Sequence, residues 1–190
     1  IRDSESDEKI VLVCTHGAYD SCCGKFGVPV YNEIKKNNEI STWSTTHVGA
    51  HRFSANLVML PEGIYYGRVN TENINNLIDS HLKEKIFLDC FRGRSCFSQT
   101  SQVSDYFLRE KIGTLGIYDI KWEFEKDRDT YTAVEFNVLS ENLVYSINSI
   151  VLNDAIKVLP SCGDNEARYL PLFYFYSLIP YTPIIKDNKS

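Results

Sequence analysis

The order of short apolar segments in the N-terminal half is the feature that most restricts how this chain can fold. Lys9–Cys14 (KIVLVC) is a short apolar run rich in β-branched residues, which predicts a buried strand. Thr15–Gly27 contains three glycines and predicts a loop. Val28–Lys36 has a proline near its start and apolar residues four apart, which predicts a helix. Ile40–Thr46 (ISTWSTT) favours a second strand.

A hairpin and a helix are predicted to follow. Ala55–Leu60 and Ile64–Val69 flank a Pro-Glu-Gly turn, and Thr71–Leu82 begins with a threonine suited to an N-cap and continues with helical apolar spacing. A strand–helix–strand unit followed by a hairpin and a helix is typical of thioredoxin-like proteins. We therefore expect a thioredoxin-like domain at residues 9–82, after a disordered terminus at residues 1–8.

Residues 83–190 have a different pattern. They predict an α+β region with antiparallel strands, packed either separately or as one unit with the first domain, so the fold class expected for the whole chain is α/β to α+β. The expected elements are a strand at Ile86–Cys90, a helix at Ser101–Lys111, and strands at Ile117–Glu125, Tyr131–Leu139 and Leu143–Ile150.

Composition excludes several classes of function. The chain has 190 residues, a formal net charge of −5 and a pI of about 5.4. Phosphate binding by nucleic-acid proteins needs a basic face, so we expect no nucleic-acid partner. The richest apolar run, Leu170–Ile179, is shorter than the roughly 18–20 residues of a membrane helix, so we expect no membrane span.

Six cysteines are present, and three of them fall within ten residues of one another. Adjacent cysteines rarely pair, so we expect reduced thiols and an intracellular protein. The expected compartment is the cytoplasm, with an organelle as the alternative, because the chain begins with Ile1 and suggests a truncated N-terminus. We interpret Cys90, Cys96 and Cys162 as structural thiols, because their spacing fits no metal site.

Four metal-ligand side chains follow the two strands predicted to be parallel. Cys14 ends the first strand, Cys23 lies nine residues later, and His47 and His51 come after the second strand. The carboxyl ends of neighbouring parallel strands lie side by side, so these four side chains should converge. Two thiolates and two imidazoles suit zinc, copper or an iron–sulfur cluster. The wide cysteine pair favours a [2Fe–2S] cluster, with one ligand pair on each iron.

Two long motifs carry a family resemblance. VCTHGAYDSCCGKFGVPV (13–30) and THVGAHRFSANLVMLPEGIYYGRVN (46–70) resemble the sucrase/ferredoxin-like family, and FRGRSCF (91–97) supports this. The resemblance implies a thioredoxin-like [2Fe-2S] ferredoxin with bis-histidinyl, non-Rieske ligation by Cys14, Cys23, His47 and His51. The family's second cysteine precedes a glycine, which selects Cys23 and leaves Cys22 as a fallback ligand.

The expected function is one-electron transfer with an unidentified redox protein partner, in redox, iron–sulfur or oxidative-stress metabolism. The free imidazole nitrogens could couple this transfer to a proton, and His16 could donate to a cluster sulfur. The alternative is a structural zinc or protein-interaction domain on the same ligands. A thiol-redox or hydrolytic enzyme is less favoured, because the sequence has no C-x-x-C, G-x-S-x-G, P-loop or G-x-G-x-x-G motif. We therefore expect an electron carrier and assign no catalytic residue.

Basic residues near these motifs have two interpretations. Arg52, beside His51, could steer an acidic partner or be a solvated charge, and the solvated charge is favoured. Arg92 and Arg94 flank Gly93 and could bind an anion weakly.

Overall fold

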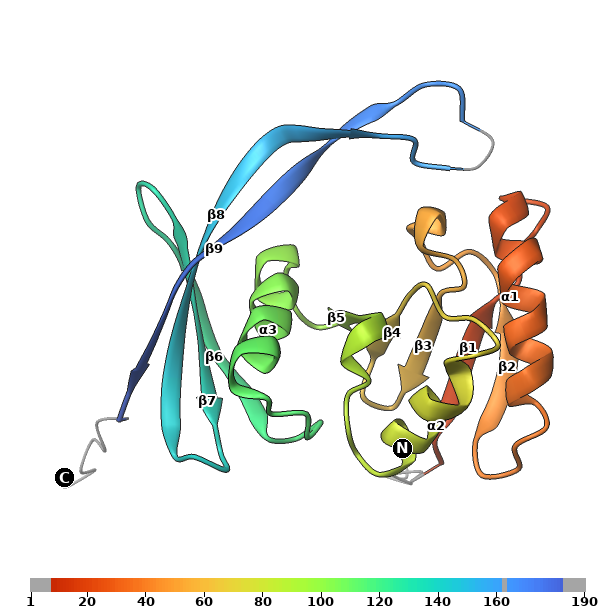
Figure 1. The fold of residues 1–190 in the computed structure, drawn as a ribbon, viewed down its shortest axis with the longest axis horizontal. Helices are drawn as coiled ribbons and strands as arrows, with labels where there is room; N and C mark the ends of the chain where they lie inside the picture. The colour runs from red at the N-terminus through yellow and green to blue at the C-terminus, as the bar shows by residue number, and fades with distance from the viewer. Residues whose placement is uncertain (1–7, 162–163, 183–190) are drawn as a thin grey trace, which may run out of the picture.

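The structure is a computed structural model that describes residues 8–161 and 164–182. The N-terminal half forms a five-stranded sheet in the order β2-β1-β3-β4-β5 (Figure 1). Its strands are β1 (Ile10–Cys14), β2 (Ser41–Thr45), β3 (Leu57–Leu60), β4 (Ile64–Tyr66) and β5 (Phe91–Arg94).

The topology of this sheet is thioredoxin-like, as expected. β1 pairs with β2 in parallel, while β1–β3, β3–β4 and β4–β5 are antiparallel. The crossover between the parallel strands is α1 (Ser21–Ile34), and α2 (Ile74–Leu82) follows the hairpin and contacts α1. This arrangement places the carboxyl ends of β1 and β2 at one edge, with Cys14 opposite Thr45.

The C-terminal half forms a four-stranded antiparallel sheet, of which three strands were predicted. Its strands are β6 (Ile120–Asp127), β7 (Thr132–Val138), β8 (Leu143–Val158) and β9 (Arg168–Tyr181). β8 continues past its predicted end at Ile150, and the fourth strand, β9, was not predicted. Helix α3 (Gln99–Ile112) stands between the two sheets and contacts β5, β7, β8 and β9 (Figure 1). The long β8–β9 ribbon extends from this sheet toward the first one (Figure 1).

Two apolar cores support the two sheets. The first fills the space between the five-stranded sheet and helices α1 and α2, and it also contains Ile86, Phe91 and Ile117. The second lies under α3, around Leu108, Phe136 and Ile147. The first sheet and its core therefore continue past residue 82, while the domain boundary itself stays a prediction.

Three element predictions in the N-terminal half were wrong in detail. Helix α1 begins at Ser21 inside the predicted loop, because the Asp20 side chain caps it by accepting a hydrogen bond from the Cys22 amide at 2.8 Å. Pro29 therefore lies inside the helix and not in its first turn. Residues predicted as a strand at 86–90 end in a 3₁₀ turn, η2 (Leu88–Cys90), and the strand comes directly after it. The N-cap of α2 is Asn73, not Thr71.

Among the described residues, no helix is both long and apolar enough to cross a membrane. The predicted disordered terminus falls outside the described residues except for Glu8, and so does Cys162.

Candidate metal centre

Four separate backbone positions bring ligand-type side chains to one edge of the first sheet. Cys14 is the last residue of β1, and Cys23 lies in the first turn of α1. His47 follows β2 by two residues, and His51 opens a 3₁₀ turn, η1 (His51–Phe53). The parallel pairing of β1 and β2 is what makes these positions neighbours.

The four side chains lie in a chain of short contacts. The ligand atoms of Cys14, Cys23 and His47 all lie within 4.8 Å of one another. The Cys23 Sγ is 3.7 Å from His47 Nδ1, and His47 Nε2 is 3.3 Å from His51 Nδ1. Two thiols and two imidazoles therefore meet in one place, and this donor set suits zinc, copper or an iron–sulfur cluster.

The loop that carries the two histidines is held by a buried amide. Gly49 and Ala50 both have positive φ, at 90° and 48°, which turns the chain so that His51 returns toward His47. The Asn56 side chain donates to the carbonyls of Gly49 at 3.3 Å and Ala50 at 3.1 Å. Sequence reasoning missed Asn56. The sequence signal that could have identified it was a single amide residue at the start of an apolar strand segment. In the structure Asn56 is only 1% exposed.

The cysteine side of the site is packed more closely than the histidine side. Cys14 and Cys23 are fully buried, whereas His47 and His51 are half-buried. A β-carbon built on Gly27 would lie 2.0 Å from the Cys14 carbonyl oxygen, so α1 contacts the end of β1 without an intervening side chain. This contact sets how close Cys23 comes to Cys14.

Burial controls the protonation of these groups. It raises the pKa of the Cys23 thiol to about 11, and the Ser54 hydroxyl, which donates to this sulfur at 3.6 Å, opposes the rise. Burial also lowers the pKa of His47, and neighbouring His51 lowers it further. The site therefore favours a neutral imidazole, which is the ligand form, and it requires a nearby cation to stabilise a thiolate.

Two neighbours cover the histidines. The Tyr19 ring stacks on His47 with ring centroids 4.4 Å apart, and it is 63% exposed. The Asp20 Oδ2 lies 3.9 Å from His51 Nε2. The His16 ring lies 5.9 Å from the Tyr19 ring, and its role as a donor to a cluster sulfur stays a prediction.

The other described cysteines are Cys22, Cys90 and Cys96. Cys22 is disulfide-bonded, so neither the expectation of a reduced thiol nor the fallback ligand role applies to it. Cys90 is buried, accepts a hydrogen bond from Asn73 Nδ2 at 3.4 Å, and has a pKa raised by burial to about 11. Cys96 is a free, exposed thiol. Neither Cys90 nor Cys96 joins a metal-binding group among the described residues.

The sequence of the N-terminal half matches a known family. Residues 2–93 match the sucrase/ferredoxin-like family. This segment contains all four candidate ligands and the whole five-stranded sheet except Arg94, the last residue of β5. This match supports the resemblance to the sucrase/ferredoxin-like family that the two motifs indicate.

Two curated relatives carry the name "Altered inheritance of mitochondria protein 32". The one from Meyerozyma guilliermondii is 29% identical over 102 residues, which cover 48% of this chain and 36% of the relative. The one from Debaryomyces hansenii is 24% identical over 103 residues, which cover 48% of this chain and 38% of the relative. The matched segment thus spans little more than a third of each relative.

Solved structures similar to this chain include thioredoxin-like [2Fe-2S] ferredoxins from Aquifex aeolicus. One is 19% identical, with a TM-score of 0.42, and the match covers 47% of this chain and 94% of that protein. A second, determined at 1.5 Å resolution, has the same identity and TM-score and is covered completely.

Proposed function

We propose that this chain binds a [2Fe–2S] cluster through Cys14, Cys23, His47 and His51 and that it transfers single electrons. The observation that carries the proposal is the meeting of two buried thiols with two half-buried imidazoles at one sheet edge. Cysteine and histidine pairs are known to share the two irons of such clusters.

The cysteine end and the histidine end of the site differ in their exposure to solvent. When bound, the cluster supplies a one-electron acceptor. Cys14 and Cys23 would hold the buried end of the group, whereas His47 and His51 would hold the end nearer to solvent, beside the exposed Tyr19 ring. We therefore expect a redox partner to dock on the histidine side. Two neutral imidazoles in place of two thiolates leave less negative charge, so a reduction potential between about −150 and +300 mV is expected.

The proposal includes a cellular compartment. The name of the two relatives concerns inheritance of mitochondria, which favours the organellar alternative over the cytoplasm for this chain. The redox partner is unidentified, and the proton coupling expected from the free imidazole nitrogens stays a prediction.

The test is an absorption spectrum with iron and sulfide analysis of protein purified without oxygen. We expect a red-brown protein with visible charge-transfer bands and about two irons and two sulfides per chain. His47→Cys and His51→Cys should each retain iron and shift the visible bands. Cys96→Ser is the matched control, because that thiol is exposed and outside the group, and its spectrum should equal that of the unmodified protein.

A structural zinc site is the second candidate. It is favoured by the close approach of three ligand atoms, which lie within 4.8 Å of one another and could surround a single tetrahedral ion. A colourless protein with one zinc per chain would support it and contradict electron transfer. A colourless protein that takes up neither zinc nor a reconstituted cluster would contradict both candidates.

A further inference from the structure

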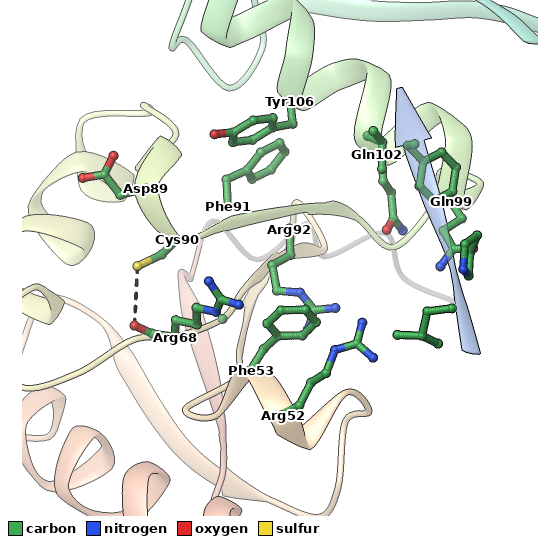
Figure 2. Close-up of a pocket in the computed structure, with 15 residues that line it drawn as sticks. Arg52, Phe53, Arg68, Asp89, Cys90, Phe91, Arg92, Gln99, Gln102 and Tyr106 are labelled. Carbon is green, nitrogen blue, oxygen red and sulfur yellow. Dashed lines mark hydrogen bonds between the residues drawn. The ribbon is translucent and has the colours of Figure 1, made fainter. Parts of the chain in front are cut away.

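Three arginines gather around one aromatic ring beside the candidate metal centre. The guanidinium carbons of Arg52, Arg68 and Arg92 lie 4.5, 5.0 and 4.3 Å from the centroid of the Phe53 ring. Figure 2 shows the Arg52 and Arg92 side chains beside this ring. The three come from η1, from the segment after β4 and from β5, so only the fold brings them together.

No carboxylate forms an ion pair with these arginines among residues 8–161 and 164–182, although Asp89 lines the same pocket. Arg92 donates one hydrogen bond, to Asn56 Oδ1 at 3.1 Å. Burial, followed by the charges of Arg52 and Arg68, lowers the pKa of Arg92 to about 10. Three like charges held this close favour an added anion.

The arginines form one wall of a pocket of about 410 Å³. Helix α3 contributes Val103, Tyr106 and the amide side chains of Gln99 and Gln102. Strand β9 contributes apolar side chains at Leu170, Pro171 and Phe173. In Figure 2 the Tyr106 ring lies beside Phe91, on the opposite side of the chain segment that carries Arg92 from Phe53. The pocket therefore has a cationic end and an apolar end, and its volume falls within the range of about 300–1,000 Å³ for small-molecule sites.

We propose that this pocket binds a small organic anion, with a phosphate or carboxylate group on Arg52, Arg68 and Arg92 and an apolar body against α3 and β9. Arginine presents a planar fork of donors that matches both oxyanions, and the pair is charge-assisted. The aromatic and aliphatic wall adds burial of the body. The weak anion site expected at Arg92 and Arg94 is thereby replaced by one in which Arg92 acts with Arg52 and Arg68.

The pocket is connected to the metal centre through two short links. Arg52 directly follows His51 in η1. Asn56 accepts from Arg92 and donates to the carbonyls of Gly49 and Ala50 in the histidine loop. A bound anion would therefore lie next to the histidine loop, yet the pocket itself does not depend on whether a cluster is present.

Calorimetric titration of the purified chain with 1-naphthyl phosphate tests the proposal, with inorganic phosphate and 1-naphthol as the two halves of that probe. We expect 1-naphthyl phosphate to bind more tightly than either half. A parallel titration with 1-naphthylacetate distinguishes the phosphate from the carboxylate. A protein that binds neither naphthyl anion at millimolar concentration contradicts the proposal.

Matched variants locate the binding. Arg52→Gln with Arg68→Gln removes two charges at exposed positions and should weaken 1-naphthyl phosphate at least tenfold, about 1.4 kcal/mol. Arg128→Gln removes a charge from an exposed turn outside the pocket and should leave the affinity unchanged. Phe173→Ala should weaken 1-naphthyl phosphate and leave inorganic phosphate unaffected. An arginine double variant that binds as the unmodified chain does would overturn the assignment.

Discussion

At the scale of single residues, buried polar groups that are not candidate ligands position the candidate metal centre. Asn56 fixes two carbonyls of the histidine loop with its amide nitrogen and receives Arg92 with its amide oxygen. A buried amide is stable only when such partners are present, since an unsatisfied polar group costs roughly 1–3 kcal/mol. The loop geometry and the pocket geometry are therefore coupled through one side chain.

His81 is a second buried polar residue, and it makes stability depend on pH. Its ring is fully buried, with Nε2 3.5 Å from Glu62 Oε2, and Glu62 in turn contacts Lys9 at 3.2 Å. Burial lowers the pKa of His81 below its ordinary value, although Glu62 opposes this effect. The unfolded chain then takes up a proton more readily than the folded chain. The stabilisation is complete above about pH 6.5 and is lost as the pH falls below that value.

We expect His81→Gln to reduce this pH dependence. The free energy of unfolding, measured by urea titration of metal-free protein at pH 8, 6.5 and 5, should fall more steeply for the unmodified chain than for the variant. His47 also has a lowered pKa, but it is present in both proteins and its contribution cancels. Equal slopes would show that His81 is not buried in its neutral form.

At the scale of elements, the contact between α1 and β1 depends on Gly27. A β-carbon there would lie 2.0 Å from the Cys14 carbonyl oxygen and 3.1 Å from its carbonyl carbon. Gly27→Ala must push the helix away from the strand, and overpacking of this kind costs about 1–3 kcal/mol. We expect a lower free energy of unfolding in urea and a lower iron content, because Cys23 moves with the helix.

Val28→Ala is the control for this substitution. It changes the adjacent position on the same helix, where the side chain is 42% exposed, and it should change stability and iron content little. A Gly27→Ala protein as stable as the unmodified chain would mean that α1 does not contact the end of β1.

The first three strands of the first sheet were predictable because their apolar and β-branched composition is a local signal. β1, β2 and β3 fall within their predicted segments, and the helix predicted at Ser101–Lys111 is α3. The start of α1 was missed, although the Asp20 N-cap is a local signal, because Gly24 and Gly27 lower the helix propensity of the segment that follows it. β5 was also missed. The FRGR sequence alone does not indicate a strand, and this segment forms one by pairing with β4.

The candidate site was predictable to a similar extent. Parallel pairing explains why two cysteines and two histidines meet, although their role as cluster ligands stays a prediction. The partnership of Asn56 with Arg92 joins residues 36 positions apart and follows only from the packed structure. The same holds for the three arginines around Phe53, which no local spacing brings together.

At the scale of the whole molecule, α3 joins the two cores through a buried ion pair. Arg109 Nε lies 2.8 Å from Asp105 Oδ1, and both side chains are fully buried. Arg94 of β5, in the first sheet, lies 3.9 Å from the other Asp105 oxygen. Arg109 also donates to the carbonyls of Thr114 at 3.2 Å and Gly116 at 2.9 Å. One carboxylate thus links the first sheet to the helix that covers the second core.

Asp105→Asn should therefore destabilise both halves of the protein together. The substitution keeps the shape of the side chain but leaves two arginines without their carboxylate, and breaking a buried pair costs roughly 3–5 kcal/mol. In hydrogen–deuterium exchange followed by mass spectrometry, the slowest amides of both β3 and β7 should exchange roughly a hundredfold faster or more. Glu110→Gln, on the exposed face of the same helix, is the control and should leave both strands protected. Faster exchange confined to β7 would show that the two sheets unfold as separate units and that Asp105 does not couple them.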